Sequence, residues 1–227
     1  MARKPTRNRT QKTGLHQTNR ASRLSSTEKQ GPPRSEMGEV RIIGGDWRGR
    51  KLPVLLSEGL RPTSDRVRET VFNWLQFDVP GARCLDLFSG SGALGFEALS
   101  RGAKSVTFLE LSSPVAKQLS QNLITLQACH GEVVQGDSLQ WLARPVASSY
   151  DIVFVDPPFN QGLMQQAVDK LFISGVLSKS DETSCSWLYL EQERTLDWPT
   201  LPNGWVCHRE KKTSNVKFGL FYFKADE

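Results

Sequence analysis

The chain has 227 residues and a formal net charge of +5, and this length predicts one domain or at most two small ones. A chain of this size can bury a hydrophobic core without disulfides or a structural metal. No apolar run approaches the roughly 18 residues of a membrane-spanning helix, and no apolar signal segment follows the N-terminus. These features argue against both a membrane protein and a secreted protein.

The positive charge is concentrated at one end of the chain. Residues 1–36 contain nine basic and two acidic side chains, whereas the remaining residues contain 20 basic and 22 acidic ones. Within that remainder, residues 41–68 hold seven basic side chains against three acidic ones. This asymmetry predicts a polyanionic partner that contacts one end of the molecule.

The cysteines do not form a metal-site pattern. Cys84, Cys129, Cys185 and Cys207 include no closely spaced pair, and the chain has only three histidines. Zinc binding and dithiol chemistry therefore lack their ligand spacing. Scattered free thiols are typical of a reducing compartment, so we expect a cytoplasmic protein that binds no metal.

Residues 1–36 are predicted to be a disordered basic arm. They are rich in Arg, Lys, Ser, Thr, Gln and Asn, and Leu15 and Leu24 are their only large aliphatic residues apart from Met1. Such a segment cannot bury enough apolar surface to offset the entropy lost on ordering. A mitochondrial targeting segment shares the Arg and Ser bias, but two leucines barely supply the amphipathic face that it needs.

Residues 37–80 predict a small hairpin followed by a helix. Val40–Ile43 reads as a short strand, and Gly44-Gly45 and the basic stretch Trp47–Pro53 follow it. A helix then opens at Arg61–Asp65, which supplies a proline near the start, a Ser or Thr cap and an acid in the first turn. One apolar stripe of this helix contains Val67, Val71, Trp74 and Leu75, and Arg66 and Arg68 lie off it.

Residues 81–227 predict a doubly wound α/β domain with an antiparallel edge. The expected strands are Cys84–Phe88, Ser105–Glu110, Val133–Gly136, Asp151–Val155 and Trp187–Glu191, and the expected helices are Ala93–Ser100, Pro114–Ala128, Leu139–Leu142 and Gly162–Leu171. Continuous apolar strands such as Asp151–Val155 suit a parallel sheet that is buried on both faces. Trp205–Arg209 and Val216–Phe223 then predict a terminal hairpin, giving a Rossmann-like fold.

The segment Asp86–Gly95 carries the pattern G-x-G-x-x-G between an expected strand and an expected helix. In that context the pattern predicts a nucleotide-binding loop, and Glu110 at the end of the next strand can accept hydrogen bonds from ribose hydroxyls. Two ligands fit, a dinucleotide and S-adenosylmethionine. Asp86 favours the second, because a carboxylate repels a pyrophosphate but attracts an ammonium and a sulfonium. The alternative role for Asp86 is a strand-end residue that bonds only local backbone.

Asp156-Pro157-Pro158-Phe159 follows a buried strand, at the sheet edge where open α/β sheets bind ligands. This sequence suits an exocyclic amino group on a flat base: the Asp156 carboxylate and the Pro157 carbonyl can accept its two N–H bonds. Phe159 can stack on the extruded base. Transfer of a methyl group to the amine would then depend on proximity and orientation.

Two further features leave alternatives open. Asp137 can bind the adenine amino group of the donor or cap the helix that follows it, and both roles can hold together. His208 and Lys211-Lys212 in the terminal hairpin are interpreted as a solvated edge rather than as catalytic groups.

On these residues the chain resembles bacterial 16S ribosomal RNA guanine-N2 methyltransferases, from about Arg41 to the terminal hairpin. The resemblance rests on Arg41–Gly45, Trp47–Pro53, Leu60–Thr63, Asp65–Thr70, Asn73–Leu75, Gly90–Gly95, Glu97–Arg101 and Val153–Phe159. The donor loop and Asp-Pro-Pro-Phe occur in many amino-methyltransferases, and the N-terminal blocks narrow the match. The arm at residues 1–36 is longer and more basic than the family needs.

The resemblance implies a class I methyltransferase fold with a seven-stranded sheet, S-adenosylmethionine as donor, and guanine N2 of 16S rRNA as acceptor. The candidate donor-binding residues are Asp86, Phe88, Ser89, Gly90, Gly92, Glu110, Leu111, Asp137 and Ser138, and the candidate catalytic residues are Asp156, Pro157, Pro158 and Phe159. Candidate contacts to rRNA phosphates are Arg48, Arg50, Lys51, Arg61, Arg66 and Arg68. We expect a monomer that acts on the small subunit or its assembly intermediate.

Two other functions remain possible from the sequence alone. The first keeps the chemistry but uses another acceptor, either DNA adenine or a different RNA amine. The second is a non-catalytic RNA-binding module of the same fold, although pure binding needs no amine-accepting loop such as Asp156–Phe159.

Overall fold

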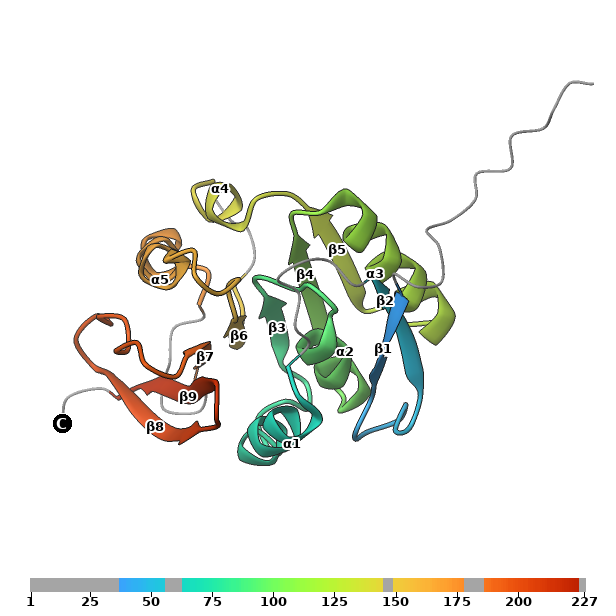
Figure 1. Ribbon diagram of the computed structural model, residues 1–227, viewed down its shortest axis with the longest axis horizontal. Coiled ribbons are helices and arrows are strands. Elements are labelled where there is room, and N and C mark those ends of the chain that lie inside the picture. The colour runs from blue at the N-terminus through green and yellow to red at the C-terminus, as the bar shows by residue number, and fades with distance from the viewer. Residues whose placement is uncertain (1–36, 56–62, 145–148, 178–185, 225–227) are drawn as a thin grey trace, which may run out of the picture. The chain divides into compact units, whose positions relative to one another are not determined.

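The computed structural model describes residues 37–55, 63–144, 149–177 and 186–224, which all belong to one compact unit (Figure 1). The predicted arm at residues 1–36, the candidate phosphate contact Arg61, and Cys185 lie outside the described residues. Among the helices of the described part of the chain, none is both long and apolar enough to span a membrane.

The described residues contain a seven-stranded sheet in the order β5-β4-β3-β6-β7-β9-β8. Its strands are β3 (Arg83–Asp86), β4 (Ser105–Glu110), β5 (Gly131–Gln135), β6 (Ile152–Val155), β7 (Trp187–Glu193), β8 (Trp205–Lys212) and β9 (Val216–Phe223). Strands β3 to β7 run parallel, and β9 pairs antiparallel with both β7 and β8. The predicted doubly wound sheet with an antiparallel edge is confirmed.

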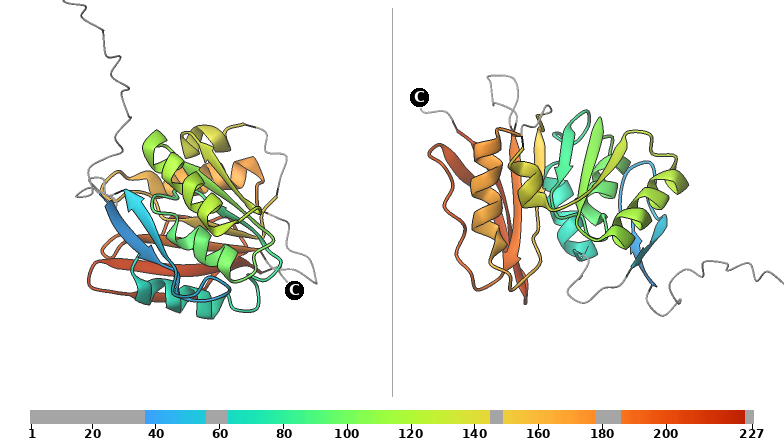
Figure 2. Two further views of the ribbon diagram at one scale, coloured as in Figure 1. Left: turned by 90° about the vertical axis from the view of Figure 1, so that its right-hand side faces the viewer. Right: turned by 90° about the horizontal axis from the view of Figure 1, so that it is seen from above.

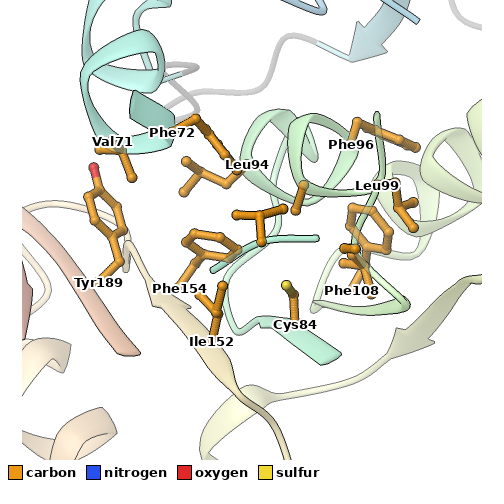
Figure 3. Close-up of a cluster of buried hydrophobic side chains, with 14 of the residues drawn as sticks. Val71, Phe72, Cys84, Leu94, Phe96, Leu99, Phe108, Ile152, Phe154 and Tyr189 are labelled. Carbon is orange, nitrogen blue, oxygen red and sulfur yellow. The ribbon is translucent and has the colours of Figure 1, made fainter. Parts of the chain in front are cut away.

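Helices cover both faces of the sheet, as Figures 1 and 2 show. Helices α1 (Asp65–Trp74), α2 (Ala93–Ser100) and α3 (Ser113–Leu126) pack on one face. Helices α4 (Ser138–Leu142) and α5 (Leu163–Ser174) pack on the other. Strand β6 serves both layers because alternate side chains point to opposite faces: Ile152 and Phe154 join the first layer, seen in Figure 3, and Val153 and Val155 join the second.

The terminal hairpin is longer than its sequence predicted. Strand β8 was expected to end at Arg209, but its pairing with β9 continues to Lys212 opposite Lys217. Nearly all of β8 is exposed, so its sequence carries little of the apolar alternation that marks a half-buried strand. The connection between the two strands is consequently residues 213–215, shorter than the expected 210–215.

The N-terminal hairpin, β1 (Met37–Arg41) and β2 (Lys51–Leu55), is attached to helix α2 through one buried acid. The fully buried carboxylate of Glu97 accepts the backbone N–H groups of Ile43 and Gly44, each at 2.8 Å. It also forms ion pairs with Arg101 at 2.7 Å and Arg68 at 3.5 Å. Since a buried charge is tolerated only when it is paired and hydrogen-bonded, this network fixes the hairpin and α1 to α2.

The chain changes direction between β3 and β6. After β3 it builds outward through β4 to β5, then returns to place β6 on the other side of β3. In open α/β sheets the crevice at such a switch point, at the carboxyl ends of the strands, is where ligands bind. Asp86 ends β3 and Asp156 directly follows β6, so both lie at this crevice.

Candidate active site

A cavity of about 1220 Å³ opens at the carboxyl ends of β3, β4 and β6. Of the predicted donor-binding residues, its lining contains Asp86, Phe88, Ser89, Gly90, Glu110, Leu111, Asp137 and Ser138. It also contains all four predicted catalytic residues, Asp156, Pro157, Pro158 and Phe159. The structure therefore brings the two separately predicted motifs into one cavity.

Gly92 is the exception, because it does not belong to the lining. It caps the start of α2 in the left-handed conformation, with φ of 73°, which glycine adopts without the strain of a side chain. A Cβ atom there would collide with Leu119 and Phe96. This glycine is therefore required by the conformation and close packing of the loop, and its contact with the donor stays a prediction.

Glu110 holds the donor loop in place. Its carboxylate accepts hydrogen bonds from the backbone N–H of Gly90 at 2.9 Å and of Ser112 at 2.7 Å. The loop is further fixed by the Ser89 N–H, which donates to the Leu109 carbonyl. Each carboxylate oxygen of Glu110 can accept more than one hydrogen bond, so the side chain can position the loop and also accept ribose hydroxyls.

Asp86 is a nearly buried acid, with 2% of its surface exposed. Its Oδ2 accepts the N–H of Gly95 in α2 at 3.1 Å. Burial raises the pKa of this carboxyl from 3.8 to about 7, and the charge of Glu110 adds to the rise. The local backbone contact expected of a strand-end acid is present, and the side chain also lines the cavity. An unpaired buried acid of this kind attracts a cationic ligand.

Asp137 caps helix α4, because its side chain accepts the N–H of Gln140 at 2.8 Å. It also lines the cavity, so the cap leaves the predicted adenine contact open. The adjacent Ser138 is buried, and its hydroxyl donates to the Leu87 carbonyl in the donor loop.

The lining that comes from β3, β4 and the loops after them carries two carboxylates, Asp86 and Glu110, and no basic side chain. Such a set repels the pyrophosphate of a dinucleotide and suits the sulfonium and ammonium of S-adenosylmethionine. The third glycine of the pattern contributes to packing: a Cβ atom on Gly95 would overlap the Phe108 ring. The residues present therefore fit S-adenosylmethionine.

Asp156, directly after β6, lines the same cavity. Its Oδ2 accepts a hydrogen bond from the Thr63 hydroxyl at 3.3 Å. Burial raises the pKa of Asp156 well above its usual range, and the negative charges of Glu191 and Asp86 raise it further. Pro157 is buried, Pro158 is exposed and Phe159 is half-buried, so the ring of Phe159 remains available for a planar ligand.

Sequence analysis missed two residues that line the cavity and interact with Asp156, namely Thr63 and Glu191. Glu191 is 4% exposed, and the Tyr189 hydroxyl donates to its Oε2 at 2.6 Å. The available signal in the sequence was the pair of acids, Glu191 and Glu193, that follows the apolar residues of β7. Acids in that position, at the carboxyl end of a buried parallel strand, point to a ligand site.

The lining also contains three cations: Arg66 of α1, and Lys211 and Lys212 of the terminal hairpin. All three are exposed. The two lysines are therefore exposed, as a solvated edge requires, and they also line the cavity; their interpretation stays a prediction.

The predicted phosphate contacts are distributed unevenly. Arg48, Arg50 and Lys51 are exposed in the N-terminal hairpin, where Lys51 pairs with Glu39 at 2.8 Å and Arg50 donates to the Thr125 carbonyl at 3.1 Å.

Arg68 contradicts its prediction, because only 1% of it is exposed. Its guanidinium pairs with Asp65 at 2.6 Å and with Glu97, and donates to the Arg41 carbonyl. These partners balance the buried charge, so Arg68 is structural and does not face a phosphate.

The family model described as conserved hypothetical protein 95 matches residues 40–222. Ribosomal RNA small subunit methyltransferase D of Escherichia coli strain K12 is 47% identical over 194 residues, which cover 86% of this chain and 95% of the relative. The protein of the same name in Haemophilus influenzae is 50% identical over 188 residues, which cover 81% of this chain and 94% of the relative.

Solved structures of related proteins have the same fold. The Escherichia coli protein yhhF superposes with a TM-score of 0.74 at 43% identity, covering 83% of this chain and all of that one. A protein solved with SAH shares the fold at 15% identity, with a TM-score of 0.63 and coverage of 85% of this chain and 57% of that one. The chain has the S-adenosylmethionine-dependent methyltransferase fold and belongs to the ribosomal RNA small subunit methyltransferase D family.

Proposed function

We propose that this protein transfers a methyl group from S-adenosylmethionine to the exocyclic N2 amino group of one guanine in 16S rRNA. The substrate is the small subunit or its assembly intermediate, in the cytoplasm, and the enzyme acts as a monomer. The names of the close relatives support the RNA substrate. The observation that carries the choice of an amino group is Asp156-Pro157-Pro158-Phe159, which shares one cavity with the donor loop.

The residues of the acceptor side account for this chemistry. An exocyclic amine on a purine is a poor nucleophile because its lone pair is delocalised into the ring. Asp156 and the Pro157 carbonyl accept its two N–H bonds and so hold the lone pair toward the donor, and the half-buried Phe159 stacks on the base. Bound S-adenosylmethionine supplies an electrophilic methyl group, and the protein contributes orientation.

The exposed cations are proposed to bind RNA and to take no part in methyl transfer. Arg48, Arg50 and Lys51 of the N-terminal hairpin, and Arg66 at the cavity, are exposed and are proposed to bind rRNA phosphates. Neutralising one of them weakens binding and makes its salt dependence shallower, without changing which base is modified.

The test measures methyl transfer and product identity together. Purified 16S rRNA and small subunits from a strain that lacks the gene are incubated with labelled S-adenosylmethionine, and the nucleosides are analysed by mass spectrometry. We expect N2-methylguanosine at a single position. N6-methyladenosine, or methylation of DNA in parallel reactions, would overturn the proposed acceptor.

Asp156→Ala tests the acceptor site within the same assay. Methyl transfer should fall by at least a hundredfold while the calorimetric affinity for S-adenosylmethionine stays within about threefold, since positioned proton and hydrogen-bond partners contribute factors of roughly 10² to 10⁴. The exposed acid Asp169 of α5 offers the matched control Asp169→Ala. Turnover of Asp156→Ala near the wild-type value would contradict the role of Asp156.

A further inference from the structure

Asp156 and Glu191 are neighbours across two parallel strands. The last paired residues of β6 and β7 are Val155 and Leu190, and Asp156 and Glu191 are the residues that directly follow them. Residues in register on adjacent strands point to the same face of a sheet. Both side chains line the cavity, so two carboxyl groups stand side by side where the amine is proposed to bind.

Glu191 is built into the protein as a buried acid with a defined partner. Tyr189 precedes it by two residues on the same face, at the edge of the cluster in Figure 3, where its ring lies 6.0 Å from that of Phe154. The Tyr189 hydroxyl donates to Glu191 at 2.6 Å. A donated hydrogen bond favours the ionised form of a carboxyl group, so this contact opposes the rise in the pKa of Glu191 that burial causes.

We propose that Glu191 is a positioning residue that makes Asp156 the proton acceptor of the methyl-transfer step. The inference rests on the proposed function, because it concerns the proton that an amino group loses. A lone, solvated aspartate is a weak base that can accept a hydrogen bond but retains a proton poorly at neutral pH. A second negative charge beside it makes the same oxygen a stronger base.

The step balances as follows. The guanine N2 lone pair forms a bond to the methyl carbon, and the carbon–sulfur bond breaks with its electron pair remaining on sulfur. N2, now positively charged, loses one proton to the Asp156 carboxylate and becomes a neutral secondary amine. Asp156 then releases this proton to water through the cavity, which restores the ionised acid for the next turnover.

The charged and titratable groups around the pair support this assignment. Burial and the charges of Glu191, Asp86 and Glu193 raise the pKa of Asp156, and only the Thr63 hydrogen bond lowers it. Burial also raises the pKa of Glu191, and Tyr189 opposes that rise. The cations that line the same cavity are Arg66 from α1 and Lys211 and Lys212 from the terminal hairpin.

Glu191→Gln tests the inference, because glutamine keeps the size and can still accept the Tyr189 hydrogen bond, but carries no charge. Single-turnover rates are measured from pH 5.5 to 9 with saturating donor and small subunits. The rate at the high-pH plateau should fall about tenfold, which is less than the roughly 10² to 10⁴ that a general base contributes, because Asp156 itself remains. The acidic inflection of the profile should move to lower pH, because the pKa of Asp156 loses the contribution of Glu191.

Two further variants separate this role from a structural one. Glu191→Asp restores a negative charge, so its inflection should return toward the wild-type pH. Glu132→Gln, at an exposed position of β5, removes the same charge outside the cavity and should leave the profile unchanged. A Glu191→Gln variant that loses rate with an unmoved inflection, or that keeps the wild-type rate, would overturn the inference.

The wild-type product identifies which proposal fails. If the wild-type protein produces N2-methylguanosine and Glu191→Gln behaves as wild type, the role of Glu191 is wrong and the proposed function stands. If the wild-type product is a base methylated on a ring carbon or ring nitrogen, the proposed function itself fails.

Discussion

Asp86→Asn should make the protein more stable and at the same time weaken its affinity for the methyl donor. Asp86 is 2% exposed, and its carboxyl accepts the Gly95 N–H, a bond that the asparagine side-chain oxygen can also accept. The substitution therefore removes the charge and preserves the contact. The difference in stability between the two proteins therefore reports the free-energy cost of burying an ionised acid.

The expected change in stability follows from the pKa of Asp86. Burial raises the pKa of Asp86 from 3.8 to about 7, so the folded protein binds more protons than the unfolded chain between these values. Stability therefore falls as the pH rises through that window. At 1.36 kcal/mol for each unit of pKa, ionised Asp86 costs at most about 4 kcal/mol above pH 7. Asp86→Asn should recover up to that amount at pH 8, roughly 2 kcal/mol at pH 5, and progressively less as the pH falls below 3.8.

Urea unfolding of both proteins at pH 5 and pH 8 measures this difference. Calorimetric titration with S-adenosylmethionine measures the functional side: the wild-type affinity should rise from pH 5 to pH 8 as Asp86 ionises, and the affinity of the variant should stay low and change less. Asp169→Asn, at an exposed position, is the control for loss of charge. A gain in stability that is equal at both pH values would refute the reasoning, because a buried charge cannot produce it.

Three other predictions concern the surroundings of the site. Glu97→Gln removes the buried charge that holds the N-terminal hairpin and should lower the free energy of unfolding by about 3 kcal/mol, measured in urea; an unchanged midpoint would contradict the network. Lys211→Ala and Lys212→Ala should each weaken binding of 16S rRNA and reduce the slope of log K against log salt by about 1 in filter binding, whereas the exposed control Lys117→Ala should not. Deleting residues 1–36, which carry a net charge of +7, should raise the apparent RNA dissociation constant more than it lowers turnover at saturation. A larger effect on turnover than on the dissociation constant would assign the arm to catalysis.

Sequence patterns predicted the parts of the fold that depend on local signals. Helix α2 was expected at Ala93–Ser100 and β4 at Ser105–Glu110, and both are found with those bounds. The two ligand loops could be placed because each follows a strongly apolar strand, and the carboxyl ends of parallel strands meet at one edge. The shared cavity that contains Asp86 and Asp156 follows from this topology.

The remaining errors concern contacts between segments that are distant in the chain. Arg68 lies off the apolar stripe of its helix, a position normally exposed, yet it is buried against Glu97, which is 29 residues away. Glu191 depends on the register between β6 and β7, and that register is set by tertiary pairing. A periodicity within one element cannot report such partners, because it describes which face of the element is apolar and not what covers that face.

Arg68 also changes how the charge of the protein should be understood. Its burial removes one cation from the expected phosphate surface. Glu97, one of the two acids that pair with it, belongs to α2, the helix that follows the donor loop and is capped by Gly92. The backbone of Gly45 lies so close to this helix that a Cβ atom would overlap the Ser100 carbonyl. The N-terminal hairpin is thus fixed directly to the element that shapes the donor site. Its exposed cations therefore occupy a set position relative to the acidic cavity, as the proposed division between phosphate binding at the hairpin and methyl transfer in the cavity requires.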